Sequence, residues 1–161
     1  MRLINFIWLP LLLSGAIARG EDFKLIEALP DRMAAAKKEF HSKADTGVNA
    51  KMIEATNQMN DQIKEMLRDL VKAYYKDKPA TLKALDKFFV DIEKVAQDEQ
   101  ALDNPTGENE GEIARLYVPS RITEDLTDKV QGLVEAIVPP DSDFDFDAWT
   151  KRWEEAVKAG D

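Results

Sequence analysis

The chain has 161 residues, of which 44% are hydrophobic and 33% are charged, and it contains no cysteine. This length suits a single domain and the apolar content is enough for a core, while the lack of cysteine excludes disulfides, Cys-ligated metals and thiol chemistry. The formal net charge of -9 argues against nucleic acid and anionic membranes as partners and is compatible with a basic protein.

The first eighteen residues have the pattern of a secretory signal peptide. A basic Arg2 precedes an almost continuous apolar run from Leu3 to Leu13, and residues 16–18 (Ala-Ile-Ala) fit the small-residue cleavage pattern. The run is well short of the ~20 residues that a membrane span needs, so an uncleaved anchor is the less favoured alternative. We expect residues 1–18 to be removed. The mature protein, with a net charge of -10 because Arg2 is lost, is then periplasmic or secreted and free of the membrane.

The remaining sequence is typical of helices throughout, with little glycine and no strand-like alternation. An interrupted helical pattern covers residues 21–43, where Pro30 marks the interruption and Asp31 suits a restart. The clearest helix covers about residues 48–75, because its apolar residues recur at alternating spacings of three and four. This stripe consists of Met52, Thr56, Met59, Ile63, Met66, Leu70 and Tyr74.

The opposite side of that helix carries like charges four residues apart, at Asp61, Glu65 and Asp69. Such pairs do not stabilise an isolated helix, so packing of the apolar stripe must do so.

A short turn at residues 76–78 precedes a third helix over about residues 79–102, and a connection this short makes the two helices antiparallel. Residues 103–111 (DNPTGENEG) have turn chemistry throughout. A fourth helical segment follows, with a predicted break at Pro119 and a restart capped by Ser120 or Thr123. The stripe of the third helix consists of Leu85, Phe88, Phe89, Ile92, Val95 and Ala96.

Two consecutive prolines at 139 and 140 end the fourth segment, and a last short helix is expected over about residues 146–158. Asp145 is the expected cap of this helix, with Phe144 packing on Trp149 as a hydrophobic staple. The predicted fold is a small all-α antiparallel helical bundle over residues 19–138. An acidic C-terminal segment over residues 139–161 carries a short helical appendix.

The residue types do not favour an enzyme. His41 is the one histidine, it stands near a predicted helix end, and a solvated or dipole-stabilised role is favoured there over general base catalysis. No phosphate-binding or nucleophile motif occurs, and no pair of carboxylates is singled out by its spacing. We therefore expect no catalytic residue and no cofactor.

The acidic run at residues 141–147 has a calcium-binding alternative. Asp143, Asp145, Asp147 and Glu154 match four ligand positions of an EF-hand loop, but Ala148 stands where that loop needs glycine. An Asp-rich helix start explains the run better, so no metal site is expected. The test is calorimetry, in which micromolar calcium affinity that is lost in Asp143→Asn would contradict this expectation.

Two tryptophans in the last helix are candidates for a partner-binding patch. Trp149 and Trp153 stand four residues apart, and tryptophan is favoured at binding hot spots. The alternative is that both side chains pack against the bundle, as the buried side of a short helix does.

Several short motifs resemble the LprI-type lysozyme inhibitor family in their order. Residues 55–60 (Ala-Thr-Asn-Gln-Met-Asn) look like the family's T-Q-x-E-M-N opening, and Phe89 stands where that family often has tryptophan. Residues 111–117 resemble its G-G-S-I segment, and residues 126–127 its Leu-Thr pair. The resemblance covers roughly residues 51–133.

The sequence also departs from that family. The family's cysteines would fall near Gln62, Gln97 and Arg121, and its Arg-Asp pair is replaced by Glu93 and Lys94.

The resemblance implies a protein that binds and blocks a basic lysozyme outside the cytoplasm. An acidic surface would steer such a partner, and Glu108, Glu110 and Glu112 around the 103–111 loop are the candidate contacts. A solvated connecting loop is the plainer alternative for these residues. The alternative function is a periplasmic scaffolding module that holds a protein partner and has no enzyme target.

Overall fold

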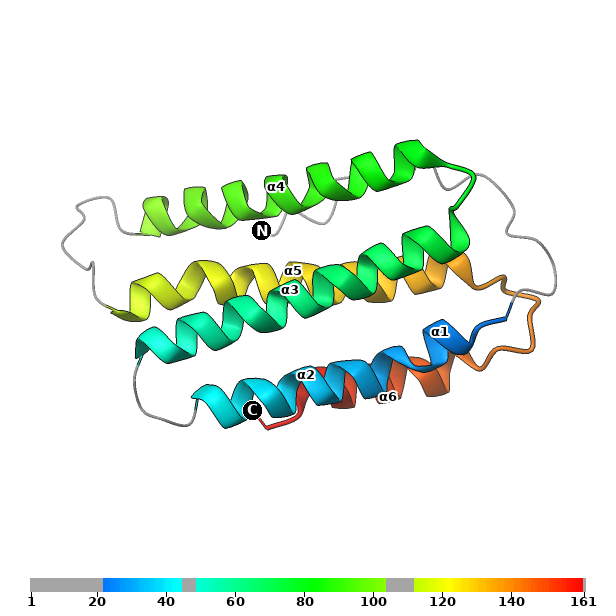
Figure 1. Cartoon of the computed structure of the whole chain (residues 1–161), viewed down its shortest axis with the longest axis horizontal. Helices are drawn as coiled ribbons and strands as arrows, with labels where there is room; N and C mark the ends of the chain where they lie inside the picture. Colours follow the sequence, from blue (N-terminus) through cyan, green and yellow to red (C-terminus); the bar gives the residue numbers. More distant parts are fainter. Residues whose placement is uncertain (1–21, 45–48, 104–111, 161) are drawn as a thin grey trace.

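The computed structural model describes residues 22–44, 49–103 and 112–160, and its regular elements are all helical (Figure 1). They are α1 (Lys24–Glu27), α2 (Leu29–Ala44), α3 (Asn49–Tyr74), α4 (Pro79–Asp103), α5 (Glu112–Ile137) and α6 (Phe146–Lys158). The predicted all-α bundle is confirmed. The predicted signal peptide lies outside the described residues, and none of the described helices is both long and apolar enough to cross a membrane.

The five longer helices lie side by side, with α3 at the centre (Figure 1). Helix α3 packs against α2, α4 and α5, while α6 lies along α2. Helices α2, α3, α4 and α5 alternate in direction along the chain, so α3 and α5 run the same way. The short turn between α3 and α4 makes these two antiparallel, as predicted.

The predicted stripe on α3 is the main contribution of this helix to the core. Met59, Ile63, Met66 and Leu70 are all buried. The helix also buries a second set of side chains beside that stripe, because it has neighbours on several sides. This second set consists of Ala55, Asn60, Leu67 and Val71.

Helix α5 continues through Pro119, so the predicted break and restart there are wrong. Proline cannot donate to the carbonyl four residues before it, which normally breaks a helix. Here the Pro119 carbonyl accepts from Asn60 Nδ2 at 2.9 Å, and the Thr123 hydroxyl lies 3.0 Å from the same oxygen. Thr123 Oγ1 is also 2.6 Å from Asn60 Oδ1. Thr123 therefore bonds within α5 rather than capping a restart, and buried Asn60 ties α3 to the proline turn.

Helix α6 shares the core of the bundle. Trp149 and Trp153 are only 3% and 1% exposed, and Trp149 Nε1 donates to the carbonyl of Ile26 at 2.8 Å. Asp145 caps the helix as predicted, because its side chain accepts from the Ala148 backbone N–H at 2.9 Å. The C-terminal helix is therefore packed into the bundle along α2.

Trp149 stacks on Phe146, with ring centroids 5.9 Å apart, as well as on Trp153. Phe144 instead packs edge-on against Phe23 at 5.5 Å. The staple expected between Phe144 and Trp149 is thus replaced by a contact that joins the start of α6 to the segment before α1.

Candidate protein-binding surface

The negative charge of this protein is concentrated in one part of the chain. Residues 91–128 contain eleven carboxylates and three basic side chains, a net charge of -8, whereas the whole chain has a net charge of -9. This range covers the second half of α4 and about the first two thirds of α5, together with the connection between them. We call residues 91–128 the acidic hairpin end.

One arginine is shared by three carboxylates at this end of the bundle. Arg121 Nε lies 3.2 Å from Glu99 Oε2 on α4, and Arg121 Nη1 lies 3.1 Å from Glu124 Oε2 and 3.1 Å from Asp125 Oδ1 on its own helix. The hydroxyl of Tyr117 is 3.4 Å from the same Glu99 oxygen. The contact between Arg121 and Glu99 joins α4 to α5, and the group keeps an excess of two negative charges.

The Asp125 carboxylate is the least solvated member of this group. Its side chain is mostly buried, and Oδ2 is buried without a hydrogen-bond partner in the described structure. Burial raises the pKa of Asp125 above its ordinary value, Arg121 opposes that rise, and the nearby Asp128, Glu99 and Glu124 add to it. Folding therefore makes this carboxyl harder to ionise than it is in the unfolded chain.

We expect Asp125→Asn to stabilise the protein at pH 7 by less than about 1 kcal/mol, because the variant also weakens the ion pair with Arg121. Because the pKa of Asp125 is higher in the folded than in the unfolded protein, the wild-type protein becomes more stable as the pH falls from the folded pKa towards the unfolded pKa. The advantage of the variant should therefore shrink towards pH 4. Urea unfolding at both pH values checks this, with Glu135→Gln on the exposed side of α5 as control. An Asn variant less stable than wild type at pH 7 would contradict it.

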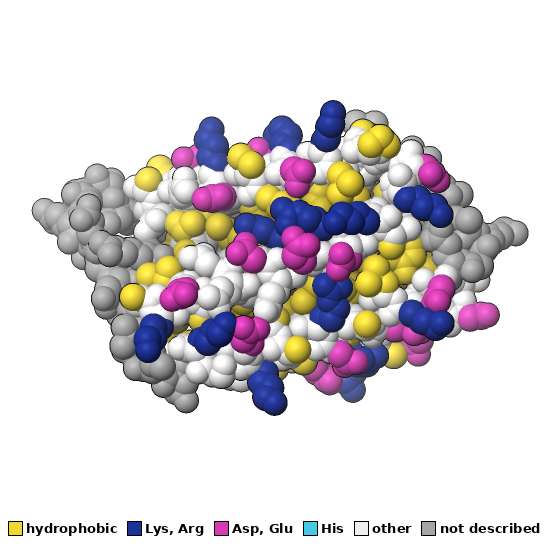
Figure 2. Space-filling model, in the orientation of Figure 1, with side chains coloured by type: hydrophobic (Ala, Val, Ile, Leu, Met, Phe, Trp, Pro, Cys, Tyr) yellow, Lys and Arg dark blue, Asp and Glu magenta, His cyan; other side chains and the backbone are white. Residues whose placement is uncertain are grey.

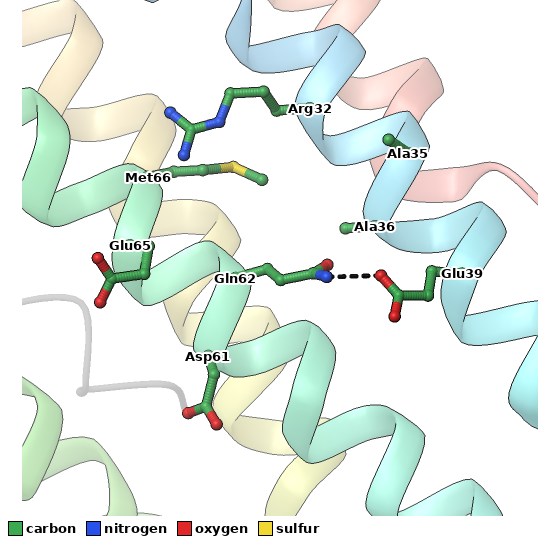
Figure 3. Close-up of a pocket in the computed structure, with 8 residues that line it drawn as sticks. All are labelled: Arg32, Ala35, Ala36, Glu39, Asp61, Gln62, Glu65 and Met66. Atoms are coloured by element: carbon green, nitrogen blue, oxygen red, sulfur yellow. Dashed lines mark hydrogen bonds between the residues drawn. The ribbon is translucent and has the colours of Figure 1, made fainter.

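A groove of about 410 Å³ lies between α2 and α3. Its apolar floor comes from Ala35, Ala36 and Met66, and Gln62 reaches across it to donate to Glu39 at 2.7 Å (Figure 3). It exists because α2 presents small side chains opposite Met66.

The charges around this groove are balanced. The ion pairs are Arg32 with Asp69, Glu39 with Lys43, Asp61 with Lys64, and Glu65 with Arg68. On the face formed by α2, α3 and α4, acidic and basic side chains are intermingled (Figure 2). The groove therefore has no charge preference for a ligand, unlike the acidic hairpin end.

The structure describes only some of the predicted contact residues. Glu108 and Glu110 lie outside the described residues, and Glu112 is the first residue of α5. Trp149 and Trp153 are buried in the core, so their interpretation as an exposed partner-binding patch is wrong and the packing alternative is confirmed. The reason is that α6 presents this side to α2, with which it shares the core.

His41 and Asp145, which the sequence offers as a general base and a calcium ligand, both make contacts that hold the helix ends. His41 lies in the last turn of α2, and its Nε2 is 3.0 Å from the carbonyl oxygen of Ala159 near the C-terminus. Gly160 follows with φ +80°, and an added Cβ would come within 2.3 Å of His41. Asp145 caps α6, and the described residues contain no group of three or more acidic or histidine side chains placed to hold a metal.

The sequence alone does not indicate the cluster of Arg121 with Glu99, Glu124 and Asp125, which we call the Arg121 group. The signal was present as Arg121, Glu124 and Asp125 at spacings of three and four on one helix. Glu99 lies on another helix, and only the packing of α4 on α5 brings its carboxylate to Arg121. Comparison of the chain with protein-family models, with curated proteins and with solved structures finds no match.

Proposed function

We propose that this chain is a secreted or periplasmic binding protein for a basic protein, and that it acts as a lysozyme inhibitor does, by occupying its partner. The observation that supports the proposal is the concentration of a net charge of -8 in residues 91–128. A field of one sign raises the association rate of an oppositely charged protein and opposes acidic ones. The order of short motifs that resembles the LprI-type family supports a lysozyme as the partner.

The side chains around Arg121 suit a preformed contact surface. Arg121 is held between α4 and α5 by the carboxylates of Glu99, Glu124 and Asp125, so these side chains are positioned before a partner arrives. Pre-positioned groups lose less side-chain entropy on binding. The three carboxylates outnumber the arginine, so the group attracts a lysine or arginine of the partner.

The charge contribution is tested with two triple variants of equal net charge. Neutralising Glu108, Glu110 and Glu112 to glutamine should slow association with chicken-type lysozyme roughly three- to tenfold at low salt. Neutralising the exposed Glu27, Glu54 and Glu155 should slow it less, because these residues lie outside the acidic hairpin end. Stopped-flow or surface-plasmon measurements give the rates, and equal slowing by both variants would contradict a localised contact.

Inhibition itself is tested by activity. Mature protein at micromolar concentration should cause a saturable, stoichiometric loss of lysozyme activity at physiological salt, where exposed charges are screened beyond roughly 8–10 Å. Chicken-type and goose-type lysozymes are the two targets to assay. Loss of activity with neither enzyme would reject the inhibitor proposal and favour the scaffolding alternative.

A further inference from the structure

The large apolar side chains that are exposed in the described part of the chain all lie on α4 and α5. Leu102 is 79% exposed, Val90 is 66% exposed and Tyr117 is 36% exposed. Leu102 stands one helical turn after Glu99 and therefore on the same side of α4. The Tyr117 hydroxyl is 3.4 Å from the Glu99 carboxylate. Leu102 and Tyr117 are thus apolar neighbours of the Arg121 group, whereas Val90 lies three turns away along α4.

We propose that Leu102 and Tyr117 are the apolar anchor of a docking surface for a cationic amphipathic segment, one that carries an apolar side chain flanked by lysine or arginine. This inference rests on the proposed function of the same surface and specifies the chemistry of the partner. Charge complementarity identifies the occupant, because the three carboxylates around Arg121 outnumber the cation by two. A second copy of this chain would bring the same excess of negative charge.

Burial of the apolar anchor contributes binding free energy that salt does not screen. Attraction between exposed charges weakens at physiological ionic strength, whereas burial of apolar surface does not depend on screening. Aromatic side chains with a polar tip are also enriched among binding hot spots. Tyr117 fits this role, since its hydroxyl is already held by Glu99 and its ring stands at the surface.

The test uses two synthetic helical peptides of equal positive charge. One carries leucine at helical spacing on one face, and the other has serine at those positions. At physiological salt the leucine peptide should bind the mature protein at least about tenfold more tightly than the serine peptide, as measured by fluorescence anisotropy. Equal binding of the two peptides would overturn the inference.

Two alanine variants locate the anchor. Leu102→Ala should weaken the leucine peptide about tenfold, whereas the matched Val90→Ala should change its affinity by less than about twofold. Both side chains are exposed on the same helix, so both variants should fold normally by circular dichroism. Equal effects of the two variants would overturn the anchor assignment.

The same variants separate this inference from the proposed function. If lysozyme binds and Leu102→Ala weakens it no more than Val90→Ala, the anchor is wrong while the proposed function stands. If lysozyme does not bind but the leucine peptide binds through Leu102, the inhibitor proposal is wrong while the anchor stands.

Discussion

Replacing Trp153 with alanine is expected to lower the free energy of unfolding by about 3–5 kcal/mol. The indole is only 1% exposed and stacks on Trp149, with ring centroids 5.8 Å apart. Truncation leaves a cavity between α6 and α2 that close-packed neighbours fill only in part. Urea unfolding followed by circular dichroism measures the change.

The neighbouring Lys151→Ala is the matched control, because Lys151 is exposed on the same helix. It should leave stability within about 0.5 kcal/mol of wild type. If Trp153→Ala instead gave two transitions, with α6 lost first and the remaining helices unfolding as in wild type, α6 would be an independent appendage. A single transition at lower denaturant is the expected result.

Replacing Leu70 with alanine is expected to cost about 2–5 kcal/mol. Leu70 is fully buried on α3, in the stripe that faces the core of the bundle. Because α3 packs against three other helices, a cavity there should weaken the whole bundle rather than one end. The exposed Lys72→Ala on the same helix is the control. A Leu70→Ala protein that unfolds like wild type would mean that the register of α3 is wrong.

The helix positions were largely predictable because they depend on local periodicity. The spacing of Met59, Ile63, Met66 and Leu70 fixes one face of α3, and the turn at residues 76–78 fixes the direction of α4. The cap of α6 was also predictable, since an aspartate before a helix has a local partner in the backbone.

The continuity of α5 was not predictable from local sequence. Asn60 stands 59 residues before Pro119 and donates to its carbonyl, so a side chain from another helix holds the turn that contains the proline. Phe144 likewise packs against Phe23, which stands before α1, while Phe146 stacks on Trp149. Contacts of this kind become visible only when the helices are assembled.

The candidate surface was predictable only in its charge. The excess of acidic residues between 91 and 128 can be read from the sequence, but the sharing of Arg121 by Glu99 and Asp125 depends on how α4 packs on α5. Tryptophan as a residue type suggests a binding hot spot, but packing along α2 removes Trp149 and Trp153 from the surface. The exposure of Leu102 follows from the tertiary structure and has no signal in the sequence.

The central claim is that the acidic hairpin end is the surface that contacts a basic protein. The most direct test is backbone amide chemical-shift mapping of the mature protein with chicken-type lysozyme at physiological salt. We expect the perturbed amides to cluster in residues 91–128, with Leu102 and Tyr117 among them and the amides of α2 and α6 unchanged. Perturbations centred on α2, α6 or the groove between α2 and α3, or none at saturating lysozyme, would contradict the claim.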